Sequence, residues 1–322
     1  MTRTVRQRAL LYLKGMAMGA ADVVPGVSGG TIAFISGIYE ELLATIRSFG
    51  PETLRVLRTQ GVRAAWLQFN GTFLLTLLAG VGTSIVLLVR PITWALEHQP
   101  VLIWSFFFGL VAASVLICGK KVRRWSVPPI AGLLVGAAAA AAISFSGVAT
   151  APDNLAFYFL AGAIAICAMI LPGISGSFIL LLMGAYAPVM NAIKTFDVAT
   201  IGVFAGGCVV GLMLFSRLLS WMFKRHHDLT TSTLTGFLLG SMLIIWPWKQ
   251  IVSVRESSHG PVPFMRDNVL PGDYAIVSAS ERLLGITEKQ PQLAGAIALM
   301  VFGAALLVIL ERLAPRDDAL KS

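Results

Sequence analysis

Long apolar stretches constrain the fold of this chain more than any other feature of its sequence. Uninterrupted stretches occupy residues 70–89, 100–118, 127–147, 198–222, 230–248 and 291–312. About 20 apolar residues of α-helix cross the roughly 30 Å hydrocarbon core of a bilayer. Of the whole sequence, 56% is hydrophobic and only 13% is charged. We therefore predict an all-α polytopic membrane protein, with residues 1–322 forming a single transmembrane domain and a mature N-terminus rather than a signal peptide.

Two further apolar regions are each interrupted by the motif Pro-Gly-x-Ser-Gly. The motif "VVPGVSGG" lies between residues 8–24 and 31–47, and "ILPGISGS" lies between residues 155–171 and 178–193. Proline removes a backbone donor and glycine relaxes the backbone, so each motif is predicted to end one helix and begin another in a new direction. The freed backbone groups cannot face lipid, so each break must be buried in protein or line a wet cavity.

The two halves of the sequence resemble one another around these breaks. Pro25, Gly26, Ser28, Gly29, Ile32, Gly37, Tyr39 and Ile46 recur at one offset as Pro172, Gly173, Ser175, Gly176, Ile179, Gly184, Tyr186 and Ile193. At a shorter offset, Gly80, Arg90, Trp94, Gly109 and Ser114 recur as Gly207, Arg217, Trp221, Gly236 and Ser241. We predict two repeats, residues 1–147 and 155–315, each a broken re-entrant helical hairpin plus three transmembrane helices.

The distribution of basic residues predicts how the chain is inserted. If each hairpin enters and leaves on one side, the N-terminus, the 48–66 segment, the "GKKVRR" loop and the C-terminus all share a side. The 249–290 segment falls opposite, with five basic and five acidic residues. Basic loops stay in the cytoplasm, which predicts that both termini lie there. It also accounts for the net charge of +9 without a nucleic-acid partner.

Three spans per half is an odd number, so the two repeats are predicted to be inverted and their breaks to meet near the bilayer midplane. This architecture is typical of transporters. The first N–H groups of a helix lack partners and carry about half a positive charge, which suits phosphate or carboxylate. The candidate phosphate-binding residues are Gly26, Ser28, Gly29, Gly30, Gly173, Ser175, Gly176 and Ser177. The alternative is that both breaks are structural bends with capping serines.

Two carboxylates are candidates for proton coupling. Asp22 immediately precedes the first break, and a carboxylate at membrane depth is a functional candidate because burying its charge is costly. Asp22 is either a proton carrier or the acceptor for loose N–H groups at the break. Glu40 either joins Asp22 in a proton relay or is solvated at the interface, which we favour.

Three basic residues are candidates for the headgroup site. Arg90 and Arg217 end matched spans and could flank the central site, holding an anion by bidentate hydrogen bonds. Alternatively, both reach lipid headgroups at the ends of their spans. Lys14, inside the first hairpin, is a further candidate.

The segments "KGMAMGAADVVPGVSGGTIAFISGIYEELL" and "ILPGISGSFILLLMGAY" resemble the signatures of PopT-type polyprenyl-phosphate transporters, a bacterial and archaeal membrane family that was formerly a domain of unknown function. The resemblance covers nearly the whole chain. It implies recycling of undecaprenyl phosphate, the lipid carrier of cell-wall and surface-glycan precursors, to the cytoplasmic leaflet. The phosphate would bind at the paired breaks while the tail stays in lipid, with Arg90 and Arg217 assisting and Asp22 coupling protonation to movement.

Other functions remain open at this level. A carrier of a small soluble anion would need the same site. A membrane lipid-phosphate enzyme is less favoured because the spans show no base, nucleophile or metal-ligand cluster, and "GVSGG" lacks the strand and histidine of a nucleophile elbow. A scaffold would not need two breaks. No metal or cofactor is expected, the partners are the lipid phosphate and membrane lipids, and the oligomeric state is not indicated.

Overall fold

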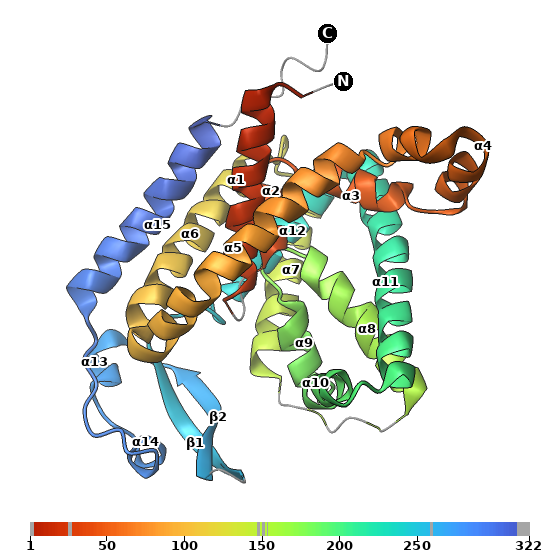
Figure 1. Ribbon diagram of the computed structural model, residues 1–322. Helices are drawn as coiled ribbons and strands as arrows, with labels where there is room; N and C mark the ends of the chain where they lie inside the picture. Colours follow the sequence, from red (N-terminus) through yellow and green to blue (C-terminus); the bar gives the residue numbers. More distant parts are fainter. Residues whose placement is uncertain are drawn as a thin grey trace.

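The computed structural model describes residues 3–24, 28–146, 149, 152, 154–257 and 260–313, and it is mainly helical (Figure 1). The first half contains α1 (Val5–Asp22), α2 (Gly29–Ile35), α3 (Tyr39–Ser48), α4 (Pro51–Gln68), α5 (Gly71–His98), α6 (Pro100–Lys120) and α7 (Val127–Phe145). The second half contains α8 (Leu155–Ile170), α9 (Gly176–Leu182), α10 (Tyr186–Thr195), α11 (Val198–Arg225), α12 (His227–Ser241), β1 (Lys249–Ser257), β2 (Gly260–Asn268), α13 (Pro271–Tyr274), α14 (Ala279–Leu283) and α15 (Leu293–Leu313).

Several helices have the length and composition of membrane spans. Within the described residues, α5, α6, α7 and α11 are each long and apolar enough to cross a bilayer, and the bent pair α9–α10 would add a fifth span. The prediction of a helical membrane protein is thus confirmed in outline. The expected span over residues 230–248 is shorter than predicted, because α12 ends at Ser241 and turns follow it.

The hairpin arms after the two breaks are not single helices, which corrects the sequence expectation for residues 31–47 and 178–193. Each arm begins with a helix of seven residues, α2 or α9, and then turns into a ten-residue helix, α3 or α10. The turns contain Gly37 and Gly184, whose φ angles of +77° and +71° favour glycine. The axes of α9 and α10 differ by 105°.

Helices pack in pairs through close glycine contacts, and the contacts recur between the halves. α1 packs on α5 where a Cβ at Gly80 would stand 2.2 Å from the carbonyl oxygen of Tyr12, and α8 packs on α11 where a Cβ at Gly207 would stand 2.0 Å from that of Phe159. In the same way Gly109 lies on α15 and Gly236 lies on α7. Small residues let helix backbones approach this closely. The glycines that recur in the sequence therefore lie at close helix contacts in both halves.

The two ends of the molecule are formed by different helices and strands (Figure 1). The start of α1 lies at the same end as α4, whereas β1, β2, α13 and α14 lie at the opposite end. α5 runs from the α4 end toward the strands, and α11 runs the other way and finishes beside α3. The long polar segment is therefore on the side away from α4, as the sequence predicts.

The 249–290 segment is more ordered than a plain loop, and its two strands were not foreseen. β1 and β2 pair antiparallel with an irregularity at Ser253. The carboxylate of Glu281, 1% exposed, accepts hydrogen bonds from the N–H of Ile251 (3.1 Å) and of Ser278 (2.9 Å) and pairs with Lys289 at 2.7 Å. Burial alone would raise the pKa of Glu281, but these bonds together lower it below its ordinary value.

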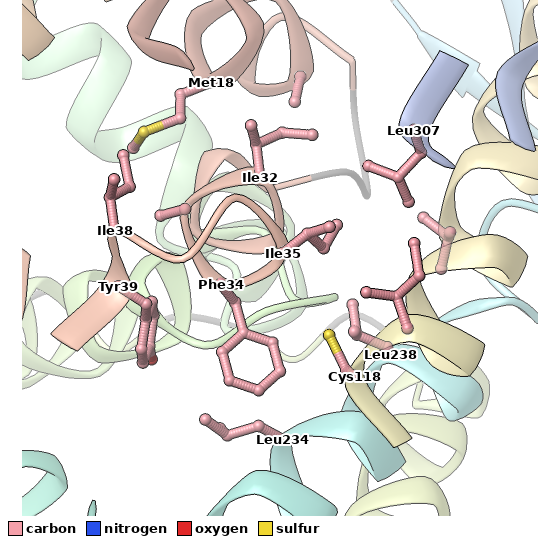
Figure 2. Packing of buried hydrophobic residues seen from close by; sticks show 14 of the residues in the cluster. Met18, Ile32, Phe34, Ile35, Ile38, Tyr39, Cys118, Leu234, Leu238 and Leu307 are labelled. Atoms are coloured by element: carbon pink, nitrogen blue, oxygen red, sulfur yellow. The ribbon is translucent and has the colours of Figure 1, made fainter. Parts of the chain in front are cut away.

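The core of the molecule surrounds α2. All seven of its residues are buried, and the apolar side chains around it come from distant parts of the chain, among them Met18, Cys118, Leu234, Leu238 and Leu307 (Figure 2). In α9, by contrast, Gly176 alone is buried. The two breaks therefore lie in different surroundings although their sequences match.

Candidate functional site at the two helix breaks

The two breaks lie against each other. The hydroxyl of Ser28 donates a hydrogen bond to the carbonyl oxygen of Met169, 2.9 Å away. The amide N–H of Gly173, in the second motif, donates to the hydroxyl of Thr31, also at 2.9 Å. Side chains of the first half therefore satisfy backbone groups that the break in the second half leaves without a partner in their own helices.

Two further contacts tighten this junction. A Cβ added to Gly30 would stand 2.5 Å from the carbonyl oxygen of Ile170, so only glycine allows the two chains to approach this closely. The buried hydroxyl of Tyr39 donates to the same oxygen at 3.1 Å. Ile170 is the last residue of α8, so the second break begins at this contact.

Side chains of the first break already occupy the N-terminus of α2. The N–H of Gly29 donates to the Asp22 carboxylate at 2.6 Å, and the N–H of Gly30 donates to the Ser28 hydroxyl at 3.1 Å. The next amide, that of Thr31, donates to the carbonyl oxygen of Ser28. Asp22 therefore has the capping role, one of the two expected for it, and proton transport by Asp22 stays a prediction. Gly26 lies outside the described residues.

Lysines occupy the other end of α2. The ammonium group of Lys14 donates to the carbonyl oxygen of Ser36 at 2.6 Å. The ammonium group of Lys121 donates to those of Phe34 (3.2 Å) and Ile35 (3.3 Å). The C-terminus of a helix carries partial negative charge and its N-terminus partial positive charge. The charges around α2 therefore match its dipole, with the carboxylate at its N-terminus and two lysines at its C-terminus.

The second break has no such caps. No side chain caps α9, and the hydroxyl of Ser175 pairs instead with that of Ser177 at 2.9 Å. Ser177 is exposed and Ser175 is half-buried. Met169 stands where Asp22 stands in the first half, so no carboxylate competes for the α9 amides. The second break thus presents two hydroxyl groups at an uncapped helix start.

The two predicted arginines lie on the surface. Arg217 donates to the carbonyl oxygen of Met213 at 3.4 Å, and its guanidinium lies beside Gly50, at the α3–α4 connection. Arg90 is exposed on α5, just before Pro91. In the described part of the chain, no hydrogen bond or ion pair joins either arginine to the break residues. Their exposure favours anchoring at the membrane interface, and phosphate binding by them stays a prediction.

Glu40 lies away from Asp22, at the start of α3. Its side chain is 65% exposed, and its carboxylate oxygen is 4.0 Å from Nε2 of His227. Sequence reasoning missed Thr31 at the junction of the breaks, and it missed Lys121 and His227 near the C-terminal end of α2. The basic run around Lys121 indicated only topology, and no pattern in the sequence shows which face of α6 meets α2.

The described residues offer little for catalysis. Across them, no group of three or more His, Cys, Asp or Glu side chains could hold a metal ion. The hydroxyl of Ser28 bonds to backbone groups of Met169 and Gly30, and neither bond involves a histidine base of the kind that a hydrolytic serine needs.

Comparisons with known proteins agree on one family. Residues 18–262 match the VCA0040-like family, described as undecaprenyl phosphate translocase-like. The chain is 45% identical over 306 residues to a polyprenyl-phosphate transporter of Vibrio cholerae serotype O1, which covers 95% of this chain and 96% of that protein. It is 31% identical over 256 residues to a polyprenyl-phosphate transporter of Staphylococcus aureus, covering 73% and 85% of the two chains. No solved structure matches. The chain therefore belongs to the undecaprenyl phosphate translocase-like family.

Proposed function

We propose that this protein returns a polyprenyl phosphate, of the undecaprenyl phosphate class, across the bacterial cytoplasmic membrane for reuse as a carrier of cell-wall and surface-glycan precursors. The observation that carries the proposal is the 45% identity to a polyprenyl-phosphate transporter over 95% of the chain. The apolar helices and the paired breaks are the features such a transporter needs. Both termini and the loop after α6 face the cytoplasm in this proposal, and the strands face outward.

The proposed architecture is a pair of inverted repeats, residues 1–147 and 155–315. The helix boundaries support it, because α9, α10 and α11 begin and end at the positions that correspond to α2, α3 and α5. The equivalent glycine contacts of Gly80 and Gly207 support it too. The opposite directions of α5 and α11 (Figure 1) are those that inversion requires. Such repeats can rock against each other around a site near the membrane centre.

The phosphate would bind first at the second break. The hydroxyls of Ser175 and Ser177, with the amides of Gly176 and Ser177, offer donors that no side chain caps. Phosphate is the ligand that such donors suit, because it is a strong acceptor and carries negative charge. Gly173, at φ +84°, gives the chain the sharp turn that places these groups together.

The first break would exchange ligands during transport. Asp22 now accepts the N–H of Gly29, and a protonated carboxyl group would hold that amide less strongly than a carboxylate does. Protonation of Asp22 would therefore free the amide of Gly29 for phosphate, which couples proton binding to headgroup movement. The polyprenyl tail is too long to enclose and would remain in lipid beside the helices.

Reconstituted protein tests the function directly. Proteoliposomes that contain labelled undecaprenyl phosphate in one leaflet should show its appearance in the other leaflet, without release of inorganic phosphate. Uptake of free phosphate with no lipid movement would replace the proposal by a soluble-anion carrier. Release of inorganic phosphate from the lipid would instead indicate an enzyme.

A further inference from the structure

A small pocket lies beside the C-terminal end of α2, where the two halves of the chain meet. Its volume is about 60 Å³, which is room for about four to six water molecules, and a single phosphate group is of this size. Its lining includes Tyr39, Glu40 and Lys121 from the first half and His227 and Thr231 from the second half. No residue that the sequence assigns to phosphate binding lines it.

The pocket contains donors that the protein does not use for itself. The ammonium group of Lys121 has three N–H donors, and two of them bond to carbonyl oxygens of α2. Thr231 is 1% exposed and, among the described residues, its hydroxyl makes no hydrogen bond. Thr231 lines the pocket together with Lys121, so its hydroxyl adjoins an open space beside a cation.

A carboxylate stands at the edge of this space. Glu40 lies 4.0 Å from Nε2 of His227, while the other ring nitrogen of His227 lies 3.3 Å from Asp228. The Glu40 side chain is 65% exposed, so it can turn outward at little cost in free energy. An anion that enters the pocket can therefore replace Glu40 beside the imidazole.

The repeat supplies no matching pocket in the other half. The positions that correspond to Lys121, Glu40 and His227 are Trp248, Ala187 and Pro100, none of which carries charge. The break motifs match in sequence between the halves, whereas the charged residues of this pocket have no charged counterparts at the corresponding positions. The pocket therefore serves one side of the membrane rather than the symmetric crossing step, and the basic loop that begins at Lys121 identifies that side as the cytoplasm.

Tyr39 joins the pocket to the breaks. Its side chain lines the pocket, and its hydroxyl donates to the carbonyl oxygen of Ile170, where the second break begins. A phosphate group that leaves the breaks along Tyr39 therefore reaches Lys121 next.

We propose that this pocket is a second binding site for a phosphate monoester headgroup, at the cytoplasmic mouth of the transport path. The inference rests on the proposed function, since that function supplies the ligand. The third N–H of Lys121 and the hydroxyl of Thr231 donate to phosphate oxygens. The Nδ1 atom of His227 faces the Asp228 carboxylate, so Nε2 adds a third donor in the imidazolium form of the ring, as Glu40 turns outward. The pocket receives the headgroup after it passes the breaks.

Binding measurements on the full-length protein test the pocket. Protein in phosphatidylcholine nanodiscs is titrated by calorimetry with farnesyl phosphate and, separately, with inorganic phosphate. The Lys121→Gln variant should bind farnesyl phosphate at least about tenfold more weakly, the loss expected for one charge-assisted hydrogen bond. Thr231→Val, which removes no existing bond, should weaken binding by about threefold to tenfold. Glu40→Gln should strengthen binding, because it removes a competing anion.

Lys120→Gln is the matched control, because Lys120 is exposed and adjacent to Lys121, and it should bind within about twofold of wild type. Equal losses in Lys120→Gln and Lys121→Gln, or wild-type affinity in both Lys121→Gln and Thr231→Val, would overturn the proposal.

Binding of inorganic phosphate with the same dependence on Lys121 supports recognition of the headgroup alone, whereas binding of farnesyl phosphate only supports recognition of headgroup and tail together. If wild-type protein moves lipid in proteoliposomes while the pocket variants bind normally, the pocket fails and the proposed function stands. If wild type moves no lipid, the function itself fails.

Discussion

Ser28 in the first half of the chain donates a hydrogen bond to the carbonyl oxygen of Met169 in the second half, 2.9 Å away. The same hydroxyl oxygen accepts the N–H of Gly30 at the start of α2. One buried side chain therefore caps a helix and joins the two halves at their breaks. The junction is a feature of both repeats together, and changes on either side of it should affect both.

Replacing Ser28 by alanine should weaken this junction. The Ser28→Ala variant loses a helix cap and the bond to Met169, and we expect its free energy of unfolding to fall by about 1–3 kcal/mol. Denaturant titration of the purified protein in detergent measures this. Ser177→Ala serves as control, because Ser177 is exposed and bonds to Ser175 alone among the described residues. A control variant as unstable as Ser28→Ala would contradict the assignment.

Gly30 should tolerate no larger side chain. The Cβ of Gly30→Ala would lie 2.5 Å from the carbonyl oxygen of Ile170, so the breaks must separate or the variant must lose about 1–3 kcal/mol to overpacking. We expect lipid movement in proteoliposomes to fall at least about tenfold, the effect of about 1.4 kcal/mol on the transport barrier. Gly82→Ala, on the exposed face of α5 with nothing within 4 Å of the new Cβ, should transport like wild type. Full transport by Gly30→Ala would show that the close approach of the breaks is dispensable.

Asparagine and alanine at position 22 distinguish the two roles of Asp22. Asn keeps an oxygen that accepts the N–H of Gly29, so Asp22→Asn should retain most of the stability, whereas Asp22→Ala should lose about 1 kcal/mol of capping energy. Neither Asn nor Ala can take up and release a proton, so proton-coupled transport should be lost in both variants. Thermal unfolding and lipid movement across a pH gradient are measured on the same preparations. Normal gradient-driven transport by Asp22→Asn would leave Asp22 with the capping role alone.

The 249–290 segment should lose stability in acid because of Glu281. Its folded-state pKa lies below the ordinary value of 4.5, so its contribution is fully present above pH 4.5 and is lost as the pH falls through the folded-state value. Fluorescence of Trp246 and Trp248, which pack against this segment, reports the transition. Glu281→Gln should remove the acid transition and cost about 3–5 kcal/mol at neutral pH by leaving Lys289 unpaired.

The control for this experiment is Glu288→Gln, an exposed glutamate in the same segment. It should keep the acid transition of the wild-type protein and its neutral-pH stability. An acid transition that survives in Glu281→Gln would assign the effect to another carboxylate.

Much of this organisation was predictable from the sequence. Apolar runs of membrane length predicted α5, α6, α7 and α11. The matched motifs predicted the two helix breaks, which lie between Asp22 and Gly29 and between Ile170 and Gly176. These features depend on local composition or on spacing along the chain, which the sequence shows directly.

Other features depend on tertiary contacts that no local pattern reveals. Gly37 and Gly184 each introduce one positive φ angle within an apolar run and so form a turn there. The apolar composition of these runs does not predict such a turn. The capping of α2 by Asp22, Lys14 and Lys121 depends on which faces of α1 and α6 point inward. The two breaks match in sequence, yet their helix starts differ. Asp22 caps α2 at the first break, whereas Met169 stands at the corresponding position of the second break and α9 has no side-chain cap.

A helix of seven residues is too short to hold its shape alone in water. α2 instead depends on a carboxylate and two ammonium groups supplied by other helices, and on the buried wall around it. The helical state of the molecule's central segment is therefore conditional on contacts made by residues outside it. A proton or a phosphate that reaches the centre of this protein therefore acts first on whether α2 remains helical.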